Sequence, residues 1–200
     1  MTMKTILSLI FALFLPLSLP AWAAAQSPED LVRQITNDVL DAIKKDKDLQ
    51  TGNKEKALAL AEQKVLPHLD FLEMTRLASG RAWNTATPDQ REKLVTAFRA
   101  MLVRTYANSI DVYRGQTMSV VSAKVLPDAT EATVRNRYAS PGRRPTPVDY
   151  EMRKSGNEWK VYDIVVDGIS LVLTYRTQFD DAVRSSGIDG LIKQLQAKTK

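Results

Sequence analysis

The sequence predicts an α+β fold in which N-terminal and C-terminal helices pack on a strongly twisted four-stranded antiparallel sheet. Hydrophobic residues recur about every 3.6 positions up to residue 113, at every second position between residues 117 and 166, and again at helical spacing from residue 169. Consecutive strands with short links pair most economically as an antiparallel meander, and this order of segments places the helices on one face. A strongly twisted sheet curls, so helices laid across it can leave an apolar cavity.

The four strands are expected at residues 117–126, 130–140, 146–154 and 158–166. The turns between them are marked by Pro127-Asp128, Pro141-Gly142 and Gly156-Asn157. The fourth strand is largely apolar on both faces, so it must be covered on both sides or cover something that is not protein. Gly168 then permits a sharp change of direction before the next helix.

The helices are expected at residues 28 to 45–48, 54–66, 71–79, 88–113, 169–184 and 188–197. Ser27 and Thr87 are N-cap residues, because each is followed by proline at the first helical position. Gln90 stands three residues after Thr87 and completes a capping box. Gly80 and Gly187 are suitable positions for a helix to end, since glycine readily adopts a left-handed conformation.

The first 23 residues predict a secretory signal peptide rather than part of the fold. Lys4 supplies a positive start, residues 6–15 form an apolar run too short to span a membrane, and small residues follow at the spacing that signal peptidase requires. Cleavage is expected after Ala23, with Ala25 as the close alternative. Residues 24–200 then form a single exported domain with a real hydrophobic core.

Composition excludes several kinds of functional site. The chain has no cysteine and a single histidine, His68, so thiolate sites, thiol nucleophiles and multi-histidine metal sites are ruled out. The formal net charge of +5 falls to +4 without Lys4, and the basic residues are interleaved with acidic ones rather than gathered in a run. This pattern disfavours a nucleic-acid-binding function, which needs a concentrated basic surface.

The sequence contains no clear catalytic constellation. His68 follows a proline at a helix end and is expected to be an ordinary surface residue. Asp163 lies on an apolar strand, so its carboxylate should be paired, and Arg176 is the candidate partner. The alternative is that Asp163 acts as a general base in a cavity. We therefore expect no enzyme activity, while keeping an Asp163-dependent enzyme as the rival hypothesis.

Apolar residues on the helices and on the sheet predict a binding pocket between them. Periodicity alone cannot distinguish a pocket from an ordinary core, because both place apolar side chains on one face. The residues expected to line the pocket are Phe98, Leu102, Tyr106, Val134, Tyr138, Val148, Tyr150, Met152, Val161 and Leu171.

An ordered set of short segments carries a family resemblance over nearly all of the chain after the signal peptide. The segments include Val65-Leu66-Pro67-His68-Leu69-Asp70-Phe71, Gly80-Arg81-Ala82-Trp83, Thr87-Pro88-Asp89-Gln90-Arg91, Tyr113-Arg114-Gly115-Gln116, Val148-Asp149-Tyr150, Trp159-Lys160-Val161-Tyr162-Asp163, Gly168-Ile169-Ser170 and Gly187-Ile188-Asp189-Gly190-Leu191. With these segments in this order, the chain resembles the toluene-tolerance Ttg2 family, whose best-known members are the periplasmic phospholipid-binding MlaC proteins.

The resemblance implies an NTF2-like fold and a periplasmic carrier of phospholipid. Its expected partners are an outer-membrane lipoprotein–porin complex and the MCE-type subunit of an inner-membrane ABC transporter, and its expected role is to maintain outer-membrane lipid asymmetry. The cargo is a diacyl phospholipid, with its acyl chains between sheet and helices and its headgroup outside. No cofactor or metal is implied, and the carrier is expected to be a monomer.

Two points stay open on the sequence alone. Arg143 and Arg144 are candidates for assisting a headgroup at the pocket mouth. A passive binding module for small hydrophobic solutes is a third functional hypothesis, and a cavity too small for two acyl chains would favour it.

Overall fold

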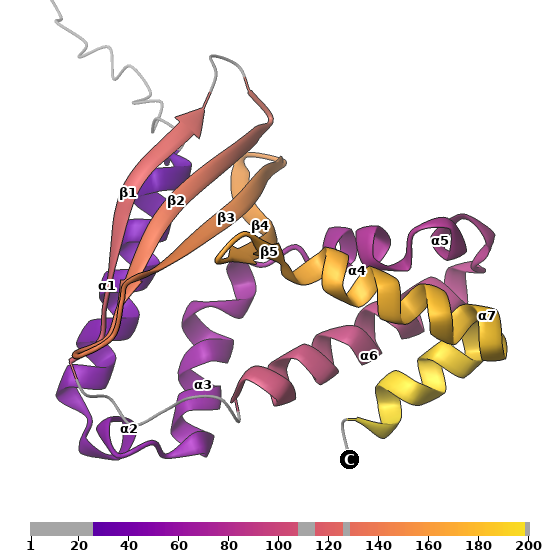
Figure 1. The fold of residues 1–200 in the computed structure, drawn as a ribbon, viewed down its shortest axis with the longest axis horizontal. Helices are drawn as coiled ribbons and strands as arrows, with labels where there is room; N and C mark the ends of the chain where they lie inside the picture. The colour runs from indigo at the N-terminus through magenta and orange to yellow at the C-terminus, as the bar shows by residue number, and fades with distance from the viewer. Residues whose placement is uncertain (1–25, 108–114, 126–128, 199–200) are drawn as a thin grey trace, which may run out of the picture.

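The computed structural model describes residues 26–107, 115–125 and 129–198 (Figure 1). The predicted signal peptide, both of its cleavage positions and the C-terminal part of the predicted helix 88–113 lie outside these residues. Helices precede an antiparallel sheet and a long helix follows it, so the predicted α+β class is confirmed. Within these three ranges, no helix has both the length and the apolar character needed to cross a bilayer.

The N-terminal helices begin at the predicted caps. α1 (Pro28–Lys45) is capped by Ser27, whose Oγ accepts a hydrogen bond of 3.0 Å from the Asp30 N–H. A short α2 (Lys47–Gln50) leads to α3 (Lys54–Lys64) and then to the 3₁₀ turn η1 (Leu66–His68). The second predicted helix therefore ends two residues early, since its last turn tightens before Pro67.

Three further helices bring the chain to the sheet. α4 (Phe71–Ser79) has the predicted bounds, and α6 (Pro88–Ala107) begins with the predicted capping box. The Gln90 N–H donates to Thr87 Oγ1 at 3.2 Å, and the Thr87 N–H donates to Gln90 Oε1 at 3.0 Å. The five-residue α5 (Arg81–Thr85) was not predicted; Gly80 ends α4 with φ of 53° and starts α5 directly.

The sheet is an antiparallel meander of five strands in chain order. Its strands are β1 (Thr117–Val125), β2 (Glu131–Ala139), β3 (Thr146–Ser155), β4 (Glu158–Val166) and β5 (Ile169–Ser170). The meander is confirmed, but the predicted number of four strands is too small by one. Asp167 and Gly168 have φ values of 51° and 80°, which form a tight turn that folds β5 back onto β4.

A β-bulge changes which side chains of β4 share a face. Met152 lies opposite Val161, whereas Glu151 lies opposite Asp163, so Tyr162 is the extra residue on β4. Ile164, rather than Asp163, therefore joins Val161 on the same face. The simple alternation predicted for this strand is wrong at this point, because a bulge cannot be recognised from spacing alone.

α7 (Leu171–Ala197) closes the described chain and bends at Gly187, which has φ of 69° and ψ of −178°. This bend confirms the predicted break between two C-terminal helices. The first of them begins at Leu171 rather than at residue 169, since Ile169 and Ser170 pair with β4.

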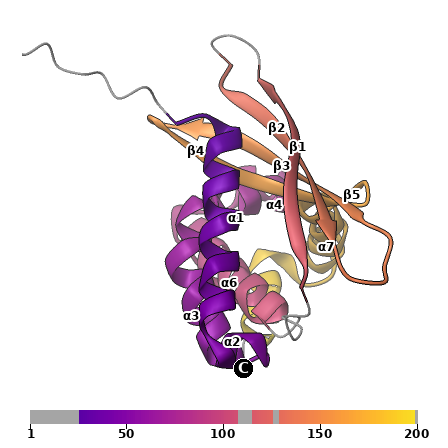
Figure 2. The same cartoon turned by 90° about the vertical axis from the view of Figure 1, so that its left-hand side faces the viewer.

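The helices gather on one side of the sheet. Figure 2 shows α1 running along the sheet with α3 and α6 on the same side, and α7 leads away from the β5 end (Figure 1). α1 contacts β1 and β2, while α7 packs mainly against α4 and α6. The molecule therefore has a sheet-side lobe and a helical lobe, joined through α4, β4 and the start of α7.

Candidate functional site

Most of the buried apolar side chains form two clusters, one in each lobe. The helical cluster contains Phe71, Met74, Ala78, Leu94, Ala97, Phe98, Met101, Leu102, Val172, Tyr175, Phe179, Ala182, Leu191, Ile192 and Leu195. The sheet cluster contains Leu31, Val32, Ala132, Val134, Met152, Trp159 and Val161. Leu69 packs against both, and the Asp70 N–H that follows it donates to the Val161 carbonyl at 2.8 Å.

The helical cluster is closely packed around aromatic rings. Phe98 meets Tyr175 edge to face at a ring-centroid distance of 5.1 Å, and it meets Phe179 in the same way at 5.0 Å. Such geometry is favourable because the positive edge of one ring faces the negative face of another. Phe98 and Leu94 have no exposed surface, so this cluster has the character of a finished core.

The sheet cluster is smaller, and partly buried side chains lie beside it. Tyr150 and Ile164 pack against it without being fully buried. The Tyr150 hydroxyl donates to the Met118 sulfur at 3.4 Å, and burial raises the pKa of Tyr150 to about 12. This phenol is therefore neutral at physiological pH and adds no charge to the apolar face.

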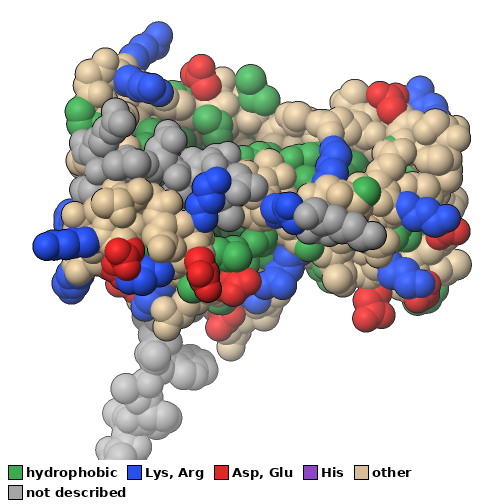
Figure 3. Space-filling model, turned by 90° about the horizontal axis from the view of Figure 1, so that it is seen from below, with side chains coloured by type: hydrophobic (Ala, Val, Ile, Leu, Met, Phe, Trp, Pro, Cys, Tyr) green, Lys and Arg blue, Asp and Glu red, His purple; other side chains and the backbone are tan. Residues whose placement is uncertain are grey.

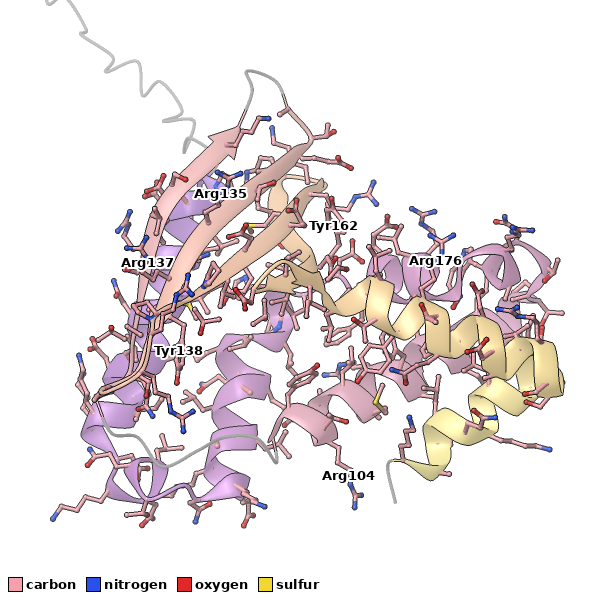
Figure 4. The ribbon with its side chains drawn as sticks, in the orientation of Figure 1. Arg104, Arg135, Arg137, Tyr138, Tyr162 and Arg176 are labelled. Atoms are coloured by element: carbon pink, nitrogen blue, oxygen red, sulfur yellow. The ribbon has the colours of Figure 1, made fainter. Side chains whose placement is uncertain are left out.

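Large apolar side chains are left half-exposed on elements of both lobes. They are Tyr106 on α6, Tyr138 on β2 and Val166 on β4. Seen from below, hydrophobic side chains gather in the middle of the molecule, between the two lobes (Figure 3). In Figure 4, Tyr138 and Arg137 lie on opposite sides of β2, with Tyr138 on the side of the helices. We use the name hollow for the helix-facing side of the sheet at Tyr138, Val148 and Val166, together with the half-exposed Tyr106 on α6.

The helical border of the hollow is also uncharged at neutral pH. A hydrogen bond joins the hydroxyls of Tyr106 and Tyr175. Burial, together with the neighbouring Tyr106, raises the pKa of Tyr175 to about 12, and burial also raises the pKa of Tyr106. Neutral phenols on the helical side and on the sheet suit an apolar occupant better than an ionic one.

The predicted pocket-lining residues are divided between the clusters and the hollow. In the helical cluster, Phe98 and Leu102 are buried and Leu171 packs at its edge. Val134, Met152 and Val161 are buried in the sheet cluster, with Tyr150 beside them. Val148 is buried on the helical side of β3, opposite Asn136. Tyr106 and Tyr138 border the hollow, so they and Val148 are the members best placed to meet a ligand.

One polar residue on this face was missed by the sequence analysis. Asn136 is buried between Val120 and Val148 on neighbouring strands. Its amide Nδ2 donates to the Val134 carbonyl at 2.9 Å, but its Oδ1 accepts no hydrogen bond. The alternation of Val134, Asn136 and Tyr138 along β2 was the signal that could have revealed its position.

The predicted pairing of Asp163 with Arg176 is wrong. The Asp163 carboxylate instead accepts hydrogen bonds from the N–H groups of Ile164 and Val172, at 2.8 and 3.0 Å, and a short one from the Ser170 hydroxyl. Ser170 also caps α7, so Asp163 ties β4 to the first turn of that helix. Both carboxylate oxygens accept hydrogen bonds from the junction between β4 and α7, which favours a structural role for Asp163 over the general-base hypothesis.

The remaining candidate residues lie on the surface. Arg143 and Arg144 are exposed in the connection between β2 and β3. Two surface pockets lie in the helical lobe: one of about 470 Å³ borders α5 and α7 at Arg81 and Arg184, and one of about 440 Å³ borders Trp83 and Val95. Neither pocket contains a predicted lining residue. In the described part of the chain, no three acidic or histidine side chains cluster so that they could hold a metal ion.

Comparison with known proteins gives consistent matches along the chain. A family model described as MlaC protein matches residues 33–197. The toluene tolerance protein ttg2D of Pseudomonas putida is 28% identical over 167 residues, which cover 83% of this chain and 77% of that protein. The intermembrane phospholipid transport system binding protein MlaC of Haemophilus influenzae is 25% identical over 176 residues, covering 86% and 82% respectively.

A solved structure extends the similarity to three dimensions. The phospholipid-binding protein from Ralstonia solanacearum, determined in complex with a phospholipid, is 36% identical and superposes with a TM-score of 0.79. The match covers 87% of this chain and 97% of that one. Since the family model and this structure both extend over most of the described residues, the chain belongs to the MlaC family.

Proposed function

We propose that this protein is a periplasmic phospholipid carrier. It moves phospholipid between an outer-membrane lipoprotein–porin complex and the MCE-type subunit of an inner-membrane ABC transporter, and thereby helps to maintain outer-membrane lipid asymmetry. The observation that carries the proposal is the phospholipid bound by the Ralstonia protein, whose fold this chain shares over most of its length. Cleavage of residues 1–23 would release the carrier as a single domain.

The geometry of the hollow supports an acyl cargo. Burial of one methylene is favourable by about 0.8 kcal/mol relative to water. Exposing two acyl chains of roughly 15 methylenes each would therefore cost on the order of 24 kcal/mol of free energy. The apolar surface of a carrier must offset nearly all of this free-energy cost. Tyr106, Tyr138 and Val166 are half-exposed side chains that such chains would cover.

The same proposal explains why the sequence shows no clear catalytic constellation. Carrying lipid breaks no covalent bond, and the carboxylate of Asp163 already serves the junction between β4 and α7. The headgroup would remain in solvent, where the exposed Arg143 and Arg144 could meet its phosphate. We therefore propose a monomeric, non-enzymatic carrier whose cargo is one diacyl phospholipid.

Organic extraction of the purified protein followed by mass spectrometry tests the cargo. We expect diacyl phospholipid in a near-stoichiometric amount. Only small hydrophobic solutes in the extract would instead favour a general binding module. No lipid in several independent preparations would contradict the proposal.

A charge inside the hollow tests its location. Val148→Glu should leave a folded protein that retains little lipid, because a carboxylate beside acyl chains is strongly disfavoured. Val121→Glu is the matched control, since Val121 is an exposed valine at the bulge of the edge strand β1. If Val148→Glu keeps its lipid while circular dichroism reports a native fold, the cargo lies elsewhere.

A further inference from the structure

Apolar side chains are presented to the outside at the corner where β4, β5 and α7 meet. Val166 is 45% exposed, Ile169 67% and Leu173 59%. Val166 and Ile169 are directly opposite in the β4–β5 pair, so they lie on one face. Leu173 follows four residues later in the first turn of α7. We call these three residues the corner patch; adjacent exposed aliphatic side chains of this kind mark a contact surface.

The corner patch continues directly into the hollow. Val148 lies opposite Val166 in the β3–β4 pair and is only 8% exposed. Exposure therefore rises stepwise along one face of the sheet, from Val148 through Val166 to Ile169. On the helical side, Leu171 packs against the helical cluster just before Leu173 turns outward. An apolar track thus runs from the inside of the molecule to its surface.

The corner is held firmly, so its exposure is part of the fold. Asp167 and Gly168 make a tight turn with both φ values positive. The Leu173 N–H donates to Ser170 Oγ at 3.0 Å, and Asp163 accepts from Ser170 and from the first turn of α7. These contacts fix the direction in which the patch faces.

We infer that the corner patch is the lip over which the acyl chains of the cargo enter and leave the hollow. This inference rests on the proposed carrier function and deepens it. A chain that leaves the hollow must cross water unless apolar surface accompanies it. Each methylene kept out of water along the way changes the rate by about fourfold. Contact with one or two methylenes at Leu173 would therefore speed transfer by about 4- to 16-fold.

The test compares two leucines of equal exposure on different helices. Leu173→Asp places a charge in the first turn of α7, and Leu72→Asp places one in the first turn of α4, where Leu72 is 58% exposed. An acidic residue is compatible with both sites, because the N-terminal turn of a helix favours negative charge. The mature protein is loaded with fluorescent phosphatidylethanolamine, and its transfer to vesicles of phosphatidylethanolamine and phosphatidylglycerol is followed in time.

We expect Leu173→Asp to slow transfer by about 4- to 16-fold, with the amount of bound lipid per protein unchanged. Leu72→Asp should transfer at the wild-type rate. An unchanged rate for Leu173→Asp, or an equal slowing by Leu72→Asp, would overturn the inference. Loss of bound lipid from Leu173→Asp would also overturn it, since the residue would then belong to the cavity.

Further variants and the wild-type control distinguish a failure of the lip proposal from a failure of the proposed carrier function. If Leu173→Asp does not fold, Ile169→Ser and Leu173→Ser carry the same prediction with a smaller change of polarity. If the wild-type protein takes up no phospholipid at all, the proposed function fails before transfer is measured. A wild-type protein that loads and transfers lipid normally, with all patch variants indistinguishable from it, refutes the lip alone.

Discussion

The helical cluster and the sheet cluster are both apolar and buried, but half-exposed apolar side chains continue the sheet face only beyond the second. Phe98 in the helical cluster is fully buried and contacts two aromatic rings at about 5 Å. On the sheet side, Val148 is buried, whereas its neighbours Tyr138 and Val166 are half-exposed. Side chains of the protein complete the first cluster, whereas under the proposed function acyl chains of the cargo would cover the half-exposed side chains beside the second. The contrast shows that one chain can have an apolar core that its own side chains close and an apolar surface that stays partly exposed; the proposed function assigns lipid binding to the second.

The largest expected effect tests the closure of the helical cluster. Phe98→Ala should lower the free energy of unfolding by about 3–5 kcal/mol, because it removes a fully buried ring and its two edge-to-face contacts. Urea denaturation followed by circular dichroism measures the loss. It should be the same for lipid-loaded and lipid-free protein.

The sheet side supplies the control for this comparison. Val148→Ala should cost less overall, and its cost should be greater in the loaded protein, where the side chain would touch the cargo. A loss for Phe98→Ala that depends on bound lipid would break the contrast. It would place Phe98 in the pocket lining, as the sequence analysis predicted.

The second effect concerns the junction between the lobes. Asp163→Ala removes an acceptor from the N–H groups of Ile164 and Val172 and from Ser170, and should cost about 2–4 kcal/mol in unfolding free energy. Asp181→Ala is the control, since its carboxylate is well exposed and pairs only with Arg184 among the described residues. If the two variants unfold at the same urea concentration, Asp163 has no structural role at the junction.

The smallest expected effect on unfolding free energy comes from the loss of a pH-dependent ion pair that also joins the lobes. Glu73 on α4 contacts Arg76 and, across to β3, Arg153, each at 2.6 Å. The hydrogen bond from Arg76 and the charge of Arg153 lower the pKa of Glu73 below its ordinary value of 4.5. This stabilisation is therefore fully present above pH 4.5 and is lost as the pH falls through the lowered pKa.

Glu73→Gln should cost about 1–2 kcal/mol at pH 7, and this difference from wild type should shrink in acid. Denaturation curves at pH 7 and at pH values below 4.5 measure the change. Glu55→Gln, at an exposed position on α3, should show no such dependence. A constant difference at every pH would mean that Glu73 acts through packing rather than through its charge.

The arrangement of secondary structure was largely predictable because its signals are local. The Thr87–Gln90 capping box, the glycine bend at Gly187 and the strand periods all act within a few residues of each other. β5 and α5 were not predicted, since a two-residue strand and a five-residue helix are too short to show a period. The bulge at Tyr162 was missed for a related reason, because it depends on the register with β3.

The sequence by itself determined the α+β class, the meander and the set of apolar residues that leave water. Only the tertiary structure decided which of those residues close a core and which border the hollow, as the separation of Phe98 from Tyr138 illustrates. It also decided that Asp163 accepts hydrogen bonds from Ser170 and from the first turn of α7 instead of pairing with Arg176. The physical reason is that periodicity records which face of an element avoids water, whereas the partner on that face is set by elements distant in the chain.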